Sequence, residues 1–200
     1  MASNILKAHP VESQSVVQQG DIFKNVTFVY DVKKEKEELR IVELTFPYVL
    51  VITQSCDMLH ESELIKNNIQ SEAKMMFSVI VVPIFEKETI TKGEHYKELK
   101  EKEIVNFNIN PTFIDKNDHK VIEKGMHYRF HSLNIDQQFE IPESIIDFKS
   151  FFTINVSAIN QMTNKRVCRI DSFGCQQIVN KFAAFLSRVG LSDESYCKIE

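Results

Sequence analysis

The run "YVLVIT", residues 48–53, constrains the fold more than any other stretch of this chain. It is continuously apolar or β-branched, it follows Pro47, and it ends at the polar residues "QSCD". A run this short favours a strand buried on both faces over a helix. A strand so apolar would invite aggregation at a sheet edge, so we expect it to pair with a neighbour on each side. The sequence therefore predicts a central strand here.

Several other segments carry strand patterns. Residues 22–30 and 39–45 alternate between apolar and polar side chains, with the charged stretch 31–38 between them as a hairpin tip or loop. Prolines are poorly tolerated inside sheets, so Pro47 is expected to end the second of these strands and Pro83 the strand "FSVIVVPIF". The remaining predicted strands are "MHYRFHSLNI" (126–135), "SIIDFKS" (144–150), "FFTINVSAI" (151–159) and "RVCRI" (166–170).

Two segments show clear helical spacing of their apolar residues. Apolar residues recur every three or four positions between His60 and Met76, which predicts an amphipathic helix. The clearest helix is Phe173 to Val189, with Ser172 as its expected cap and Gly190 just beyond its end. We expect its apolar stripe to pack on the chain's own sheet; the stripe consists of Ile178, Phe182, Phe185, Leu186 and Val189. The pattern of residues 92–104 predicts a solvated helix or charged turn. The turn residues around Lys116 to Asp118 predict a hairpin.

Strands interrupted by inserted helices, without strict alternation, predict an α+β fold around a strongly bent antiparallel sheet or a small β-barrel, completed by a C-terminal helix. We expect a flexible N-terminal segment at 1–18, a single domain at 19–192 and a short tail at 193–200.

Composition excludes several classes of protein. A chain of 200 residues with 43% hydrophobic content can bury a sizeable core. Its net charge of −4 does not attract the phosphate backbone of a nucleic acid. The four cysteines form no CxxC pair, and no apolar run reaches the roughly 20 residues that cross a bilayer. The first residues also lack the apolar core of a signal peptide. We expect a soluble cytoplasmic protein without contact to a membrane.

Cys56 raises a question of chemistry because it follows the central strand, with Asp57 next to it and His60 four residues on. A nearby imidazole or a helix N-terminus would activate a thiolate, and a thiol with an imidazole would begin a metal site. A free cysteine, however, is among the most commonly buried residues and often only packs. We expect Ser55, Cys56 and Asp57 to end the strand, with Ser55 or Asp57 bonding to the next turn or capping the next helix. We expect neither a metal nor a cofactor.

The segment "MHYRFHSL" offers a second candidate site. Strand alternation would place His127, Arg129 and His131 on one face, where two imidazoles and a guanidinium suit the acid, base and phosphate clamp of a ribonuclease. The alternative is that these residues form the solvated face of a half-buried strand or a face that pairs with acidic neighbours, for which Asp147 to Lys149 could supply partners.

Three motifs, "QGDIF", "PYVLVITQSCD" and "VIVVPIF", together resemble the N-terminal half of MazF/PemK-like toxins over about residues 19 to 86. That resemblance implies an SH3-like barrel and cleavage of RNA. The whole chain is also similar to a group of uncharacterised bacterial proteins in which "GDIF", "SQSCD", "VVPI", "IIDFKSFFTI" and "KFAAFLSRVGL" occur in this order.

The toxin family needs a basic residue just before the proline of the central strand and a threonine just after the "VVPI" strand. Phe46 and Phe85 occupy these positions here, and phenylalanine neither moves protons nor stabilises an anionic phosphorus centre. The sequence therefore favours a non-enzymatic partner-binding or regulatory subunit of a bacterial toxin-type or phage-defence system, with protein partners. The alternative is a MazF-like endoribonuclease that binds RNA and uses a relocated site at His127, Arg129 and His131.

Overall fold

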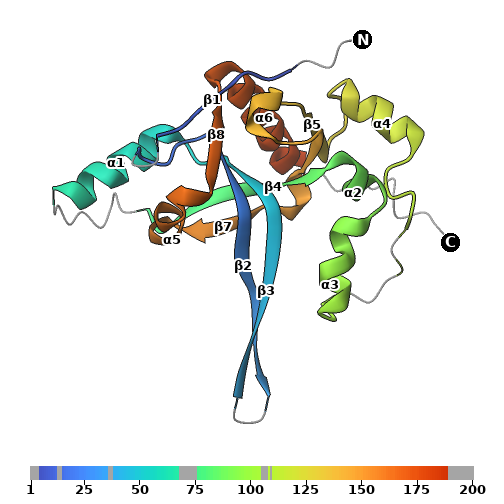
Figure 1. Cartoon of the computed structure of the whole chain (residues 1–200), viewed down its shortest axis with the longest axis horizontal. Helices are drawn as coiled ribbons and strands as arrows, with labels where there is room; N and C mark the ends of the chain where they lie inside the picture. Colours follow the sequence, from blue (N-terminus) through green and yellow to red (C-terminus); the bar gives the residue numbers. More distant parts are fainter. Residues whose placement is uncertain are drawn as a thin grey trace.

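The structure, a computed structural model, describes residues 5–12, 15–35, 38–67, 76–104, 108 and 110–188 (Figure 1). The fold is α+β. The strands are β1 (Ala8–His9), β2 (Asp21–Glu35), β3 (Glu38–Val51), β4 (Ser78–Glu86), β5 (Phe130–Leu133), β6 (Ser144–Asp147), β7 (Phe152–Asn155) and β8 (Arg166–Ile170). The α-helices are α1 (Ser55–Lys66), α2 (Lys87–Thr91), α3 (Lys97–Glu101), α4 (Lys116–Glu123), α5 (Val156–Gln161) and α6 (Ser172–Ser187). Short 3-10 turns are η2 (Glu94–Tyr96), η3 (Gln137–Phe139), η4 (Phe148–Ser150) and η5 (Thr163–Lys165).

The strands form one curled antiparallel sheet in the order β1-β8-β2-β3-β4-β6-β5, with β7 paired to β4 beside this path. The two ends of the sheet approach each other, because the Leu6 amide donates to the Asn134 carbonyl at 2.8 Å and Leu6 bridges Ile135. The predicted strongly bent antiparallel sheet is therefore confirmed.

The central strand is also confirmed. Strand β3 pairs with β2 on one side and β4 on the other, and Val49, Leu50 and Val51 are completely buried. Leu50 belongs to the core inside the curled sheet, whereas its neighbours Val49 and Val51 belong to a second core on the outer side. Two cores on opposite faces explain why this stretch is apolar at every position.

Both prolines lie within strands, so the prediction that they end them is wrong. Pro47 lies opposite Asn25, whose positive φ of 51° interrupts the β2–β3 ladder between the pairs Lys24–Tyr48 and Val26–Phe46. Pro83 lies between the part of β4 that pairs with β7 and the part that pairs with β6. Each proline thus sits at an irregularity of the sheet, where a missing N–H costs little.

Strands β2 and β3 continue far beyond the body as a two-stranded arm (Figure 1). Pairing extends to Glu35 and Glu38, so the predicted loop at 31–38 is wrong except at its tip, residues 36 and 37, which lie outside the described residues. One register shift occurs, with Tyr30 as the extra residue between Val29 and Asp31.

Helix α6 closes the inner core, as expected. Cys175, Ile178 and Phe182 are buried there. Leu186, predicted as part of the same stripe, is 40% exposed, and Val189 and Gly190 lie outside the described residues. The cap is Asp171 rather than Ser172, because the Asp171 carboxylate accepts from the Gly174 amide at 2.8 Å.

Other segments differ from their predictions. Helix α4 replaces the hairpin predicted at Lys116 to Asp118, because Asp115 caps it by accepting from the amides of Asn117 and Asp118. Helix α1 begins at Ser55 instead of His60, and the predicted continuation to Met76 crosses residues 68–75, which are not described.

The described residues of the N-terminal segment 1–18 contact the sheet. Strand β1 pairs with β8, and Val17 is buried in the outer core. The predicted tail at 193–200 lies outside the described residues.

Candidate binding site at the base of the arm

A pocket of about 570 Å³ lies where the arm joins the body. Its walls are Phe28, Tyr30, Leu44, Thr45, Phe46, Phe85, His95, Tyr96, Glu98, Leu99, Ser150, Phe151 and Phe152. This volume falls within the range of ligand pockets, and apolar walls with a few polar groups are typical of them.

Four parts of the chain build the walls: strands β2 and β3 of the arm, strand β4, turn η2 with helix α3, and residues 150–152. Leu44 and Phe46 alternate along β3 with Glu43 and Thr45, so strand geometry turns the two apolar side chains toward the pocket. Turn η2 and helix α3 supply His95, Tyr96, Glu98 and Leu99, and β4 supplies Phe85. Aromatic contacts join the strands, because the Phe152 ring lies 4.8 Å from Phe46 and 4.6 Å from Phe28 between centroids.

The tyrosine hydroxyl in the wall is held in place by a buried ion pair. Arg129 donates to both carboxylate oxygens of Asp147 at 2.7 Å, and its Nη2 also donates to the Tyr96 hydroxyl at 2.8 Å. Asp147 is completely buried, and its hydrogen bonds raise the pKa of Arg129 despite partial burial of the guanidinium. The pocket wall therefore contains a fixed phenol hydroxyl among mostly apolar side chains, with Thr45, Glu98 and Ser150 as further polar residues.

His95 contributes an uncharged ring to the same wall. Its ring lies 5.1 Å from that of Phe85 and 4.9 Å from that of Phe113. Among the described residues neither ring nitrogen has a hydrogen-bond partner, and burial lowers the pKa of His95 to about 4. At neutral pH the imidazole is neutral, so it adds to the apolar character of the wall.

The edge of β3 beside the pocket is occupied by the side chains of Glu98 in α3 and of Lys102, which follows that helix. The Thr45 amide donates to Glu98 at 3.1 Å, and Lys102 donates to the Glu43 carbonyl. Lys102 also pairs with Glu98 at 2.7 Å. These contacts satisfy backbone groups that an open strand edge would present to another chain.

The structure does not place His127, Arg129 and His131 along one strand face. Strand β5 begins at Phe130, so the alternation predicted across 126–131 is wrong. His127 Nδ1 accepts from the amides of Arg129 and Phe130 at 3.1 and 3.0 Å, and burial lowers its pKa. The Arg129 guanidinium is bound to Asp147 instead.

His131 lies elsewhere, beneath α6. Lys181 Nζ is 3.0 Å from His131 Nδ1 and donates to the Gly125 carbonyl at 2.8 Å. Burial, followed by the charge of Lys181, lowers the pKa of His131 to about 4. Each of the three residues thus has a partner within the fold.

Cys56, Asp57 and His60 lie in the first turns of α1. Strand β3 ends at Val51 and α1 begins at Ser55, so Ser55, Cys56 and Asp57 lie in the helix and do not end the strand as expected. Cys56 is exposed, with its Sγ 3.5 Å from Gln54 and 3.6 Å from Asp57. In the described ranges no group of three or more histidine, cysteine or acidic side chains is arranged to hold a metal ion.

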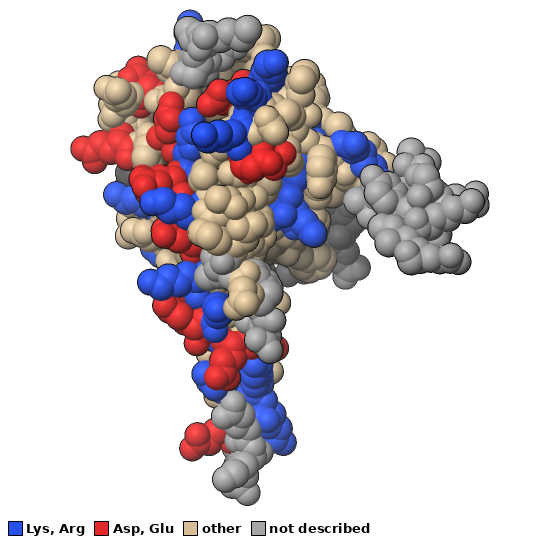
Figure 2. All heavy atoms as spheres, turned by 90° about the vertical axis from the view of Figure 1, so that its right-hand side faces the viewer, with Lys and Arg blue, Asp and Glu red and all other residues tan. Residues whose placement is uncertain are grey.

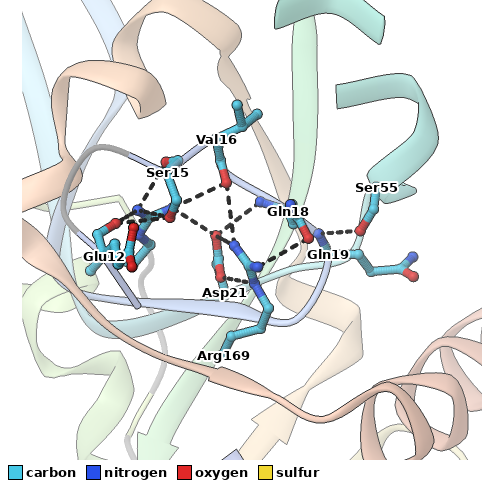
Figure 3. Close-up of polar contacts among 9 residues, drawn as sticks. Glu12, Ser15, Val16, Gln18, Gln19, Asp21, Ser55 and Arg169 are labelled. Atoms are coloured by element: carbon cyan, nitrogen blue, oxygen red, sulfur yellow. Dashed lines mark hydrogen bonds and ion pairs between the residues drawn. The ribbon is translucent and has the colours of Figure 1, made fainter. Parts of the chain in front are cut away.

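Sequence reasoning missed a polar cluster at one end of the sheet (Figure 3). Asp21, completely buried, accepts from the Gln18 amide at 2.9 Å and from Arg166 and Arg169 at 3.1 and 2.6 Å. Both arginines also donate to backbone carbonyls of segment 12–16. The cluster therefore fastens the N-terminal segment to the sheet.

This cluster joins two of the motifs noted in the sequence. Gln19, just before "GDIF", donates its amide to Ser55 Oγ at 3.2 Å and its side chain to the Ile52 carbonyl at 2.6 Å. The acidic residue of the "GDIF" motif was the available signal, because a charged residue directly before a buried strand needs a partner.

No protein-family model matches the chain, and no curated protein matches it. Within the described part of the chain, no helix is both long and apolar enough to cross a membrane.

Proposed function

We propose that the protein is a non-enzymatic binding subunit whose pocket at the base of the arm takes an apolar side chain of a partner protein. The observation that carries this proposal is the aromatic lining of the 570 Å³ pocket, in which only a few polar groups are fixed. Such a cavity gains most of its binding free energy from apolar surface removed from water.

The two positions where the resemblance to toxins would place catalytic groups hold apolar residues, which supports the proposal. Phe46 and Phe85 both line the pocket, with ring centroids 6.1 Å apart. An apolar wall therefore stands where the resemblance would place acid–base chemistry. His127, Arg129 and His131 are engaged in hydrogen bonds within the fold, which further favours binding over RNA cleavage.

The distribution of charge also favours a protein partner over a nucleic acid. Figure 2 shows lysines and arginines interspersed with acidic residues on the face that it presents, including the arm. Binding to a phosphate backbone draws on a basic surface of one sign. Because of the resemblance to toxins and to the bacterial group, we propose that the protein acts in a toxin-type or phage-defence system with further subunits.

Proteins encoded by genes next to that of this chain are the natural partners to test, each purified separately and titrated by isothermal calorimetry. Tyr30→Ser, at an exposed position, and Leu99→Asp, at a half-buried one, alter the pocket and are expected to weaken binding by at least about tenfold. Tyr128→Ser and Leu59→Asp are matched controls at exposed positions outside the pocket and should leave affinity unchanged.

Two results would contradict the proposal. One is a complex whose affinity does not respond to the pocket variants. The other is cleavage of a mixed pool of single-stranded RNA by the wild-type protein that His127→Ala and His131→Ala abolish.

A further inference from the structure

The arm has an outer face that is exposed along its length. Register and alternation place three cross-strand pairs on it, Val29 with Glu43, Val32 with Ile41 and Lys34 with Leu39. All six side chains are exposed, with Leu39 and Ile41 at 70% and 59%. Leu44 and Phe46 alternate with these positions and line the pocket on the other face. Apart from Thr45, which borders the pocket and lies on the outer face, the two faces of the arm are therefore separate surfaces.

This outer face is unusual for a ribbon in water. A two-stranded ribbon is marginally stable unless another layer covers an apolar face, and four of the six side chains are apolar. Exposed apolar residues that line up on a projecting arm mark an interaction surface more strongly than scattered ones would.

The charges on this face are arranged with opposite signs at its two ends. Lys34 lies toward the tip and Glu43 toward the body, with Val32 and Ile41 between them. If two such faces meet with the arms antiparallel, Lys34 of each copy lies beside Glu43 of the other. With the arms parallel, each lysine would meet a lysine and each glutamate a glutamate, which is repulsive.

We infer that the outer face of the arm binds the same face of a second copy of this chain, with the two arms antiparallel around a twofold axis at Val32 and Ile41. A twofold interface is self-complementary, as this charge pattern is. The outer face continues toward the body past Glu43, because Thr27 and Thr45, whose hydroxyl oxygens lie 3.4 Å apart, are exposed as well. Because the contact is small, its Kd is expected on the order of 10–100 μM.

Sedimentation velocity of the full chain from about 1 μM to about 1 mM tests this inference. The expected result is a reversible monomer–dimer equilibrium. Ile41→Asp should weaken dimerisation by at least about a hundredfold, because the twofold symmetry places the substituted residue of each copy in the interface. Lys34→Glu and Glu43→Lys should each weaken it by about tenfold, and the double variant should restore it. Lys33→Glu, on the opposite face of β2, is the matched control and should have no effect.

Three outcomes would overturn the inference. A monomer at every concentration would mean that another protein covers this face or that nothing does. A dimer that Ile41→Asp leaves intact would place the contact elsewhere. A double charge variant that fails to recover association would exclude the antiparallel arrangement. The pocket proposal is unaffected by any of these results, because neither Tyr30→Ser nor Leu99→Asp changes one of the six side chains of the outer face.

Discussion

Strands β2 and β3 each pass through two regions, the curled body and the arm, and the comparison shows what burial depends on. In the body, Val49, Leu50 and Val51 are completely buried beneath two different cores. In the arm, Leu39 and Ile41 of the same strand are mostly exposed, although they are equally apolar. Side-chain type and strand geometry are alike in both regions. The difference lies in what the rest of the chain places over each face.

The two regions also hold their charges differently. The body contains buried ion pairs, such as Asp21 with two arginines and Asp147 with Arg129, whereas the described charges of the arm are exposed. A buried charge that loses its partner is costly, while an exposed one is hydrated by water. Four changes, taken from the largest expected effect to the smallest, test how far this contrast holds.

The largest effect is expected from Asp21→Ala. It leaves the buried Arg166 and its neighbour Arg169 without their carboxylate, so the free energy of unfolding should fall by about 3 to 5 kcal/mol. Urea denaturation of Asp31→Ala, a matched aspartate on the arm, should show a loss below about 1 kcal/mol. Equal losses of unfolding free energy for Asp21→Ala and Asp31→Ala would show that the buried charge contributes no more to stability than the exposed one.

Leu50→Ala comes next, because it removes buried methyl groups from the inner core and leaves a cavity. The expected loss of unfolding free energy is about 2 to 5 kcal/mol. Ile41→Ala, nine positions earlier in β3, should cost less than about 0.5 kcal/mol at a protein concentration where the chain is monomeric. A loss under about 1 kcal/mol at Leu50 would mean that β3 is not the central strand.

Acid should weaken the body of the protein. His95 and His131 have folded pKa values of about 4, whereas an unfolded histidine has a pKa near 6.5. Between these values the unfolded chain binds more protons, so stability is full above about pH 6.5 and falls as pH drops toward 4. Urea denaturation at pH 7 and at pH 5 should give unfolding free energies that differ by roughly 2 kcal/mol for each histidine.

The variant His95→Phe keeps an aromatic ring in the wall and should remove its share of this pH dependence. His9→Gln, an exposed histidine, should leave the dependence as it is. If His95→Phe responds to acid as the wild type does, the ring is hydrated rather than buried.

The smallest effect concerns the junction of the two regions. Lys102→Ala removes a partner of Glu98 and of the Glu43 carbonyl at the strand edge. The pair is partly exposed, so global stability should change by less than about 1 kcal/mol. Hydrogen exchange at the Thr45 amide should become modestly faster, because Glu98 loses its orienting partner. An unchanged exchange rate would show that Glu98 protects the Thr45 amide even without Lys102.

Local pattern was enough to predict many elements of this chain. Unbroken apolarity predicted β3 as the central strand, and helical spacing predicted α6 and its packing on the sheet. Such predictions succeed because strand and helix periods are set by backbone geometry within a few residues. The prediction for the prolines failed because the irregularities that accommodate them arise from the pairing partners, Asn25 and the junction of β6 with β7.

The sequence by itself determined the fold class, the central strand, the C-terminal helix and the apolar residues at positions 46 and 85. Only the tertiary structure decided that those two phenylalanines line one pocket, that Arg129 binds Asp147 instead of sharing a face with His131, and that half of β3 leaves the body. Asp21 and Arg169 illustrate the reason, since their ion pair joins residues 148 positions apart. Such contacts depend on how the whole sheet curls, and no local period encodes that.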